Sequence, residues 1–470
     1  MPVPVISVTQ MREWEKATWA SGQTEAEVIR RVGQQVAQRA LQLTRPGDFI
    51  LLLAGKGHNG DDVRAAQSAI TERRVELIEV NSPAENFAKL EAALARHPAL
   101  IVDGLFGIGL NRALDVAWLK FITLINAAKL PVLAVDVPSG LSAETGETFG
   151  AAIQAAVTLT VGAPKQGLLR QSAWSFVGRL EVATDVGLVA CPHQAELQWK
   201  LPEDFRSFPP PRPIAGHKGT FGHLSIIAGS VGFHGAAVLA TRGAQRAQPG
   251  LVTALPLEPA YYQVAAQLQS AMVKPWSHDI RFPGEFSALL VGPGLAAQDV
   301  PEDLIVTVRK LWRDSALPIV ADASALDWLP MDPVSRRVIR VVTPHPGEAA
   351  RLIKTTPARL QENRPRAVRE ISKHYGNCWV VLKGHQTLIG RNEGDIFVNP
   401  SGNPYLAQGG SGDVLAGFIA GFLAQPLMQV DAGRTLRYAV WQHGAAADSL
   451  QASRRNWTVE ELVDAIGKQP

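Results

Sequence analysis

Short apolar runs recur along the chain, and most are followed by a stretch in which apolar residues return at helical spacing. In the first part of the chain these runs predict strands at 49–53, 75–80, 99–102, 131–135 and 157–161. Helices are expected within 10–43, around a break at Ser21-Gly22-Gln23, and then at 61–74, 84–96 and 115–128. Because strands that alternate with helices form a parallel sheet covered on both faces, we predict a doubly wound α/β domain.

The same alternation restarts in the second part of the chain. Strands are predicted there at 223–228, 288–291, 318–321, 339–342, 379–382 and 387–389. Helices are predicted at 235–246, 302–312 and 364–375, and two more from Val414 and from Asp431. No internal repeat relates the two parts, so we expect two unlike doubly wound α/β domains.

A proline-rich segment separates the two parts. Residues 190–214 include Pro209-Pro210-Pro211-Arg212-Pro213, which suits neither a helix interior nor a central strand and forms a semi-rigid spacer. A chain of 470 residues also exceeds one ordinary core. We therefore predict one domain at 1–200, a Rossmann-like three-layer sandwich, and a second at 212–470.

Composition excludes several classes of protein. The chain is 46% hydrophobic and 19% charged with a net charge of +3, and it has no basic block interleaved with aromatic residues, so neither nucleic acid nor membrane binding is expected. Cys191 and Cys378 lie far apart without metal spacing, and no signal peptide precedes the first helix, which favours a cytoplasmic protein. We also expect a homo-oligomer, although no particular residue indicates it.

A glycine-rich turn follows the strand at 49–53. Gly55-x-Gly57-x-x-Gly60 lies between a strand and a helix, and Glu79 closes the next strand. Read alone, this spacing is the dinucleotide fingerprint, in which the acid holds a ribose. Many glycine turns match that spacing by chance, so an oxidoreductase is one of several possibilities.

Three further strand ends carry polar residues, namely Asp103, Asp136 and Lys165. Parallel sheets bind ligands at the carboxyl ends of their strands, so these side chains can converge. Asn59, Asp103 and Ser139 offer hard oxygen atoms that suit an alkali or alkaline-earth cation. Asp136 is then a candidate acid/base. The alternative for each residue is a solvated loop or a helix cap.

The strongest signal is a glycine cluster around one carboxylate, Gly409-Gly410-Ser411-Gly412-Asp413, placed where an apolar helix begins. Glycines at a helix start leave N–H groups free to bind phosphate, and the helix dipole favours an anion there. Asp413 stands where a base would take a proton from a hydroxyl that attacks a phosphoryl group. The alternative is a turn whose Asp only caps the helix.

The first domain resembles the NAD(P)H-hydrate epimerase family in the segments 57–62, 103–107, 135–141 and 158–165. The resemblance covers nearly all of residues 1–190. It implies a potassium ion on Asn59, Asp103 and Ser139, with Asp136 as acid/base and the loop 107–113 against the substrate phosphate. The implied substrate contacts are His58, Asn59, Gly60, Asp61, Asp62, Gly107, Ile108, Gly109, Leu110, Asn111, Arg112, Ala113 and Asp136.

The first domain departs from the family in its glycine loop. Asp61 and Val63 stand where the family usually has glycine, Ala156 replaces an Asp, and Arg30 replaces a Glu. Losing a glycine restricts the backbone, and Asp61 adds a negative charge near a phosphate dianion. An N-terminal domain that binds without catalysis is therefore one alternative.

The second domain resembles the ribokinase-like dehydratase family that acts on the S form of hydrated NAD(P)H. Its motifs include 218–222, 228–230, 291–295, 321–326, 343–348, 383–387 and the glycine cluster. The match covers about 212–466, and Ala296 and Ser324 replace a usual Gly and Asp. The resemblance implies nucleotide contacts from Lys383, Gly384, His385, Gln386, Thr387 and Gly412, and substrate contacts from Ala236, Gly294, His345 and Asp413.

The predicted function is repair of hydrated NADH and NADPH. The first domain interconverts the R and S hydrates, and the second dehydrates the S hydrate with release of AMP and phosphate. ADP as donor is implied by the resemblance alone, and Mg²⁺ is expected with the nucleotide. The nearest alternative is a ribokinase-like small-molecule kinase with a non-catalytic N-terminal domain. His443 is interpreted as a packing residue.

Overall fold

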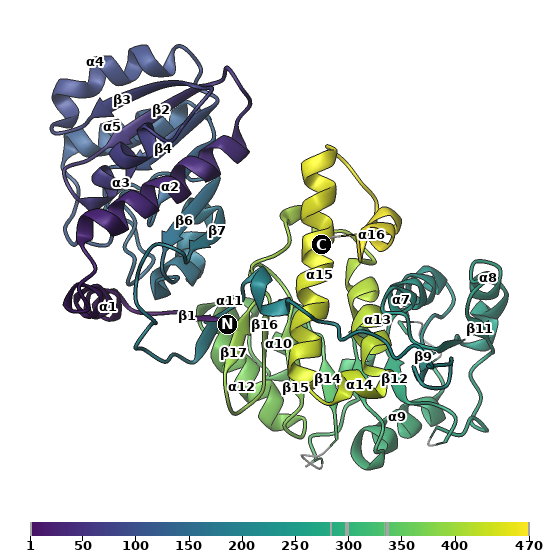
Figure 1. Cartoon of the computed structure of the whole chain (residues 1–470). Helices are drawn as coiled ribbons and strands as arrows, with labels where there is room; N and C mark the ends of the chain where they lie inside the picture. The colour runs from purple at the N-terminus through teal and green to yellow at the C-terminus, as the bar shows by residue number, and fades with distance from the viewer. Residues whose placement is uncertain (1, 283, 297–299, 333, 335–337, 469–470) are drawn as a thin grey trace. The chain divides into compact units, whose positions relative to one another are not determined.

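The computed structural model describes residues 2–282, 284–296, 300–332, 334 and 338–468. The chain forms two compact units, one of Val3–Trp199 and one of Lys200–Pro470 with the first two residues (Figure 1). Both units are α/β, as predicted from the alternating pattern. None of the helices in the described ranges combines the length and apolar character that a membrane span requires.

The N-terminal unit is built on a six-stranded sheet in which every described pairing is parallel. Its strands, in the order β3-β2-β4-β5-β6-β7, are Arg74–Glu79, Phe49–Ala54, Leu100–Gly104, Val132–Val135, Val157–Val161 and Arg179–Ala183. Strand β7 is not among the predicted strands. The short strands β1 (Val3–Pro4) and β8 (Leu197–Trp199) pair with each other in antiparallel fashion.

Two layers of helices cover this sheet. The helices are α1 (Val8–Ala20), α2 (Glu25–Leu43), α3 (His58–Gln67), α4 (Pro83–Leu94), α5 (Val116–Ala127) and α6 (Trp174–Val177). Successive residues of a strand point to opposite faces. Ile50 and Leu52 accordingly pack with α2 and α3, whereas Leu51 and Leu53 pack with α4 and α5. This is the predicted three-layer arrangement.

The C-terminal unit contains a longer sheet, ordered β17-β16-β15-β14-β13-β12-β9-β10-β11. The strands, in chain order from β9, are His223–Ile227, Leu251–Leu255, Met272–Val273, Ala288–Val291, Ile319–Ala321, Arg340–Val342, Trp379–Leu382, Leu388–Gly390 and Ile396–Val398. Pairings from β11 through to β15 are parallel, and β16 and β17 join in antiparallel fashion. Strands β10, β11 and β17 are absent from the predicted set.

Helices flank this sheet on both faces (Figure 1). They are α7 (His234–Arg246), α8 (Tyr261–Ala265), α9 (Glu302–Asp314), α10 (Pro346–Leu352), α11 (Pro357–Glu362), α12 (Arg364–His374), α13 (Ser411–Leu423), α14 (Pro426–Gln429), α15 (Ala432–Ser453) and α16 (Val459–Ala465). One core joins α7, α13, α15 and α16 to β9, β12 and β13. The helices α7 and α13 pack most closely, because a Cβ on Gly417 would lie only 1.9 Å from the carbonyl oxygen of Ala240. This contact therefore holds α13 close to α7.

Candidate active sites

The first site lies at the carboxyl ends of β2, β4 and β5, near the point where the strand order reverses between β2 and β4. Open α/β sheets bind ligands in such a crevice. A cavity of about 890 Å³ opens there, and its walls include His58, Asn59, Asp62 and residues 107–112 from the predicted substrate contacts. Gly60, Asp61, Ala113 and Asp136 are not among its lining residues.

The three predicted metal ligands form one hydrogen-bonded cluster. The Ser139 hydroxyl donates to Asp103 Oδ1 at 2.6 Å, and the Ser139 amide donates to Oδ2 at 2.8 Å. The Asn59 side-chain amide donates to the carbonyl oxygens of Phe106 and Val135, at 3.1 and 2.6 Å. The Asn59 oxygen lies 2.4 Å from the place that a Cβ on Gly107 would take, so only glycine leaves this space open.

This cluster offers oxygen ligands only. Asp103 is fully buried, and burial raises the pKa of its carboxyl to about 6 against the opposing hydrogen bonds from Ser139 and Leu105. No cationic side chain of the described residues contributes to the environment of this carboxyl. A buried acid without a compensating charge, surrounded by hydroxyl and amide oxygens, fits a hard monovalent cation.

Asp136 follows β5 and contacts a buried lysine. The backbone of Asp136 adopts φ 62°, which is unusual for a residue with a side chain and marks a constrained turn after β5. Asp136 Oδ1 accepts from Lys165 Nζ at 2.5 Å, from the Val161 amide at 3.0 Å and from the Thr160 hydroxyl at 3.1 Å. None of the described residues donates to Oδ2, so that oxygen is the one available for proton transfer.

Asp61, the extra acid in the glycine loop, has a basic partner in the structure. Arg64 donates to Asp61 at 2.8 Å and also forms an ion pair with Glu79. The extra negative charge of Asp61 is therefore compensated within α3. Glu79 is engaged as well, so the acid that the dinucleotide fingerprint assigns to a ribose already has a partner.

Glu15 of α1 also lines the cavity, and sequence reasoning missed it. Burial and the charge of Asp136 raise the pKa of Glu15, and the same two causes raise the pKa of Asp62 strongly. Glu15 lies in a helix far from every motif, so no local signal in the sequence identifies it. The cavity thus holds two acids with a tendency to remain protonated.

The second site is formed where α13 begins. Gly410 precedes the helix with φ 96°, a left-handed conformation that favours glycine, and Asp413 lies in the first turn. The described residues donate no hydrogen bond to the Asp413 carboxylate. Burial raises its pKa to about 7, helped by the charges of Asp322 and Glu348 and opposed by Lys383. A carboxyl that titrates near neutrality suits a general base.

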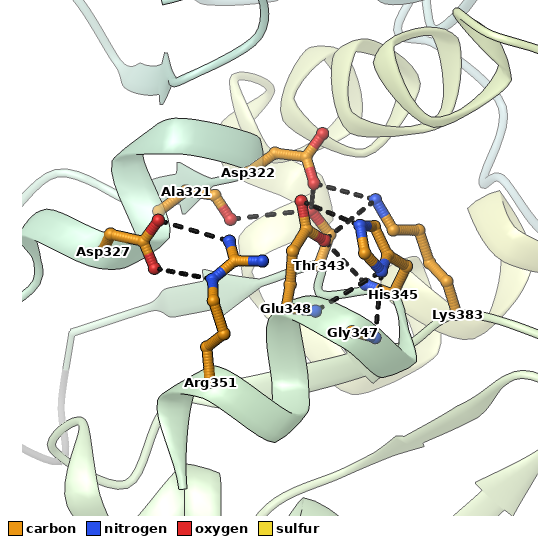
Figure 2. Close-up of polar contacts among 9 residues, drawn as sticks. All are labelled: Ala321, Asp322, Asp327, Thr343, His345, Gly347, Glu348, Arg351 and Lys383. Carbon is orange, nitrogen blue, oxygen red and sulfur yellow. Dashed lines mark hydrogen bonds and ion pairs between the residues drawn. The ribbon is translucent and has the colours of Figure 1, made fainter. Parts of the chain in front are cut away.

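Lys383 lies next to two acids, Asp322 after β13 and Glu348 in the first turn of α10 (Figure 2), and the charge of Asp413 also acts on it. Lys383 Nζ donates to Asp322 Oδ1 at 2.9 Å and lies 4.0 Å from Glu348 Oε2. Asp322 also accepts from the Thr343 hydroxyl at 2.6 Å. Although burial opposes it, the surrounding acids raise the pKa of Lys383, so the ammonium remains charged.

His345 caps a helix and also presents its ring to solvent. Its Nδ1 accepts from the Gly347 and Glu348 amides at 3.0 and 3.3 Å, and Glu348 Oε2 accepts from the His345 amide at 2.7 Å (Figure 2). These bonds form the start of α10. The side chain is nevertheless 55% exposed, which leaves the ring edge accessible to a ligand.

Arg364 holds the predicted nucleotide loop, residues 383–387, in place. The guanidinium of this buried arginine donates to the carbonyl oxygens of Leu382, Lys383, His385 and Gln386. Gly384 and Gln386 adopt φ 123° and 53°, so the loop turns sharply twice. Burial, followed by the charge of Arg364, lowers the pKa of His385 to about 4, and the imidazole is therefore neutral.

Ala236 and Gly294 lie next to each other. Gly294 has φ 65°, and a Cβ on it would meet the Phe233 carbonyl at 2.5 Å and the Ala236 methyl at 2.8 Å. Ser230 donates to the Gly294 carbonyl at 2.7 Å, which fixes this turn. The structure thus brings Ala236 and Gly294 together.

Several residues of the second site belong to the predicted motifs but are not among the predicted site residues. They are Asp322, Thr343 and Glu348, which surround Lys383, while Arg364 lies outside every motif. His443 is buried and bonds the Ser411 carbonyl at 3.1 Å, in keeping with its interpretation as a packing residue. Burial lowers the pKa of His443 to about 4.

No group of three or more His, Cys, Asp or Glu in the described ranges could hold a metal ion by itself. Mg²⁺ usually takes one or two carboxylates together with nucleotide phosphates and water. The carboxylates of Asp322 and Glu348 beside the start of α13 fit that mode of binding. Magnesium here would therefore depend on the nucleotide.

Comparison with known families gives matches in both units. The sequence profile described as NAD(P)H-hydrate dehydratase matches residues 224–468, and the one described as YjeF-related protein N-terminus matches residues 61–167. These segments contain most of the residues of the second and first sites, respectively.

Relatives of similar length share this arrangement. The chain is 32% identical to a bifunctional NAD(P)H-hydrate repair enzyme of Gloeobacter violaceus, over 99% of this chain and 97% of the relative. It is 34% identical to the enzyme of that name from Moorella thermoacetica, over 89% of this chain and 86% of the relative. With the Escherichia coli enzyme of that name the identity is 32%, over 92% and 86%.

Solved structures resemble the C-terminal unit. An ADP/ATP-dependent NAD(P)H-hydrate dehydratase from Bacillus subtilis, co-crystallised with ATP and Mg²⁺, is 30% identical with a TM-score of 0.51, covering 57% of this chain and 95% of that one. A ribokinase-like superfamily protein from Enterococcus faecalis gives a TM-score of 0.51 at 24% identity, over 60% of this chain and 97% of that one. The second likeness concerns the fold alone.

Proposed function

The chain belongs to the family of bifunctional NAD(P)H-hydrate repair enzymes, and from this premise we propose which residues perform the two reactions. It carries an epimerase domain and a dehydratase domain. We assign epimerisation of the R and S hydrates to residues 1–200 and nucleotide-driven dehydration of the S hydrate to residues 212–470. Both proposed sites lie at carboxyl ends of parallel strands.

For dehydration, the proposed base is Asp413. The observation that carries this assignment is a partly buried carboxyl in the first turn of α13 whose pKa is raised to about 7 and which receives no hydrogen bond from the described residues. Asp413 takes the proton of the hydroxyl on the hydrated ring as the oxygen attacks the outer phosphorus of the nucleotide. With ADP as donor, AMP leaves and the ring carries a phosphate ester.

The ester is a much better leaving group than hydroxide. The lone pair of the ring nitrogen expels inorganic phosphate as the carbon–oxygen bond breaks, and loss of a proton from the adjacent ring carbon restores the nicotinamide. We assign Lys383, Gly384, His385, Gln386, Thr387 and Gly412 to the nucleotide, and Ala236, Gly294 and His345 to the hydrate. A magnesium ion bound with the nucleotide would neutralise phosphate charge.

In this arrangement Lys383 and the N–H groups at the start of α13 act on the phosphate chain. The helix dipole and the ammonium both favour the negative charge that builds up during transfer. Arg364 donates hydrogen bonds to carbonyl oxygens of the 383–387 loop and so holds it in position, which makes it a positioning residue. Positioning and charge stabilisation therefore supply most of the rate enhancement.

The test of this assignment uses S-hydrated NADH with ADP and, separately, with ATP, and follows the return of the reduced-nicotinamide absorbance. The Asp413→Asn variant is expected to lose about 10²–10⁴-fold in rate, because the amide cannot take a proton. Asp314→Asn, an exposed acid at the end of α9, is the matched control. Full recovery by Asp413→Asn would refute the assignment, and a stable phosphorylated product would indicate a kinase instead.

For epimerisation, we propose that Asp136 moves a proton at the hydrated ring, with Oδ2 as the acting atom. Lys165 holds Oδ1 and thereby fixes the orientation of the carboxylate. Asn59, Asp103 and Ser139 would hold a potassium ion, which supplies positive charge next to the substrate phosphate. Residues 107–113 would contact that phosphate, and residues 58–62 complete the site.

The epimerase assignment is tested with the R hydrate as the only substrate. Recovery of NADH then depends on the N-terminal unit, since the dehydratase uses the S form. Asp136→Ala should reduce recovery to the uncatalysed rate of epimerisation, while recovery from the S hydrate stays unchanged. If wild type and Asp136→Ala consume the R hydrate equally, this residue has no such role.

A further inference from the structure

A second cavity, of about 870 Å³, lies in the C-terminal unit. The proline segment, the end of α7, the rear of α13, α14, α15 and the last described residues surround it. None of the residues assigned above to the nucleotide, the hydrate or catalysis lines this cavity. Its volume falls within the range of small-molecule sites, so it can hold a ligand of its own.

Aromatic rings form much of the wall. Phe418 and Phe422 of α13 have ring centroids 4.8 Å apart, and Phe422 meets Tyr438 of α15 edge to face at 5.5 Å. On the opposite side the Arg212 guanidinium lies 4.3 Å from the centroid of Phe221. Rings and a stacked guanidinium offer flat surfaces that suit a flat aromatic ligand.

One buried polar group on this wall lacks a partner. Gln442 is only 4% exposed, and its Nε2 donates to the Tyr438 hydroxyl at 3.1 Å. Its Oε1 accepts no hydrogen bond from the described residues. An unsatisfied buried acceptor is unfavourable, and a ligand that carries an N–H or O–H donor would satisfy it.

The charge of the cavity has one sign. Arg212, Arg246 and Lys468 line it, and its described lining includes no Asp or Glu. Arg246 pairs with Asp464, which lies outside the lining. Among the described residues, the hydrogen-bond partners of Arg212 are neutral groups, the Gln248 carbonyl and the Gln425 side chain. The mouth of the cavity therefore attracts an anion.

We propose that this cavity is a second ligand site, selective for flat aromatic anions that carry one hydrogen-bond donor. The rings of Phe418, Phe422 and Tyr438 receive the aromatic body, Gln442 Oε1 accepts from the donor, and Arg212 with Lys468 attracts the acidic group. The site is distinct from both catalytic sites and is independent of their assigned reactions.

The test uses the full-length protein and the dye anilinonaphthalenesulfonate, an anion with a flat naphthalene ring system and one N–H group. Fluorescence titration and calorimetry in the presence of saturating ADP are expected to give a site with one dye per chain. Gln442→Leu, which keeps the shape and removes the acceptor, should weaken this binding about five-fold or more. The neutral dye N-phenylnaphthylamine, which keeps the N–H group and lacks the sulfonate, should also bind more weakly.

Surface variants keep the test decisive if Gln442→Leu folds poorly. Arg212→Gln and Lys468→Glu should each weaken dye binding, while Arg242→Gln, an α7 arginine outside the cavity, should leave it unchanged. Dehydratase activity and the thermal unfolding midpoint should match the wild type in the surface variants. Equal affinity of all variants for the dye, equal binding of the neutral dye, or displacement of the dye by ADP would overturn the proposal.

Discussion

Both candidate sites place a lysine near the proposed catalytic carboxylate, but the two lysines have different partners. In the N-terminal unit Lys165 donates directly to Asp136 at 2.5 Å. In the C-terminal unit Lys383 donates to Asp322 at 2.9 Å instead, and Asp413 receives no hydrogen bond from the described residues. Burial then dominates and raises the pKa of Asp413 to about 7. The partner of each lysine therefore decides whether the neighbouring carboxylate is oriented by a direct hydrogen bond or receives none from the described residues.

The largest effect is expected from breaking the N-terminal pair. In Lys165→Met the carboxylate of Asp136 loses a cation in a place where both side chains are buried. Breaking such a pair costs about 3–5 kcal/mol of unfolding free energy. Urea unfolding measures this loss, and Lys120→Met on the exposed face of α5 is the control. A loss below that of the control would mean that the pair is not formed in solution.

The next effect concerns the loop that carries Lys383. Arg364→Gln removes the guanidinium that holds several carbonyl groups of the 383–387 segment. The KM for ADP should rise about ten-fold or more, with a smaller change in kcat, because the loop loses its preorganised shape. Arg366→Gln, two residues further along α12 and exposed, should change neither constant. A change in kcat alone would contradict a positioning role.

The pH dependence of dehydration tests whether Asp413 is the titrating base. Since Asp413 must be ionised to act as base, kcat/KM for dehydration should rise with pH through a pKa of about 7, reaching about a tenth of its plateau at pH 6. Burial is the main cause of this raised pKa, but Asp322→Asn removes one of the two acids that add to it and frees Lys383 to approach Asp413, so the rise should move to lower pH. A profile that does not move would exclude Asp413 as the titrating group.

The smallest effect is expected in the glycine loop. Asp61→Gly restores the residue usual in the family, while Arg64 keeps its ion pair with Glu79. Asp61 and Arg64 are both partly exposed, so the unfolding free energy should change by no more than about 0.5 kcal/mol beyond the intrinsic cost of glycine in a helix. Recovery from the R hydrate should not fall. A marked fall would show that Asp61 contributes to epimerisation.

Much of this arrangement could be predicted from the sequence because parallel strands end at one edge of a sheet. That rule predicts that Asp103, Asp136 and Lys165 lie at one edge of the sheet, whereas Asp413 is identified by the glycine cluster at the start of a helix. The start of α3 is an exception, since the helix begins at His58 and not at 61. Strands β10, β11 and β17 are missing from the predicted set. Length does not explain all of these misses, because β10 has five residues, as many as the predicted β9.

Partners that are distant in sequence could not be predicted in the same way. The convergence of Asp136 and Lys165 is expected from their strand ends, but the pairing of Lys383 with Asp322, 61 positions away, is not. From the sequence alone, Arg364 would be interpreted as an exposed charge in the first turn of a helix. In the structure it is buried against the 383–387 loop and donates to the carbonyl groups of that loop. Such pairings depend on strand order, which local patterns do not contain.

The contact between α13 and α7 has a consequence for variation in this protein. Gly417 lies one turn beyond Asp413, and Gly421 lies one turn further, where a Cβ would come within 2.5 Å of the Ala244 carbonyl. A methyl group at either position would push α13 away from α7 and displace Asp413, which lies on α13. The position of the proposed base therefore depends on glycine at both positions. Substitutions at Gly417 and Gly421 should be rare among natural variants, even though neither residue is assigned to a ligand.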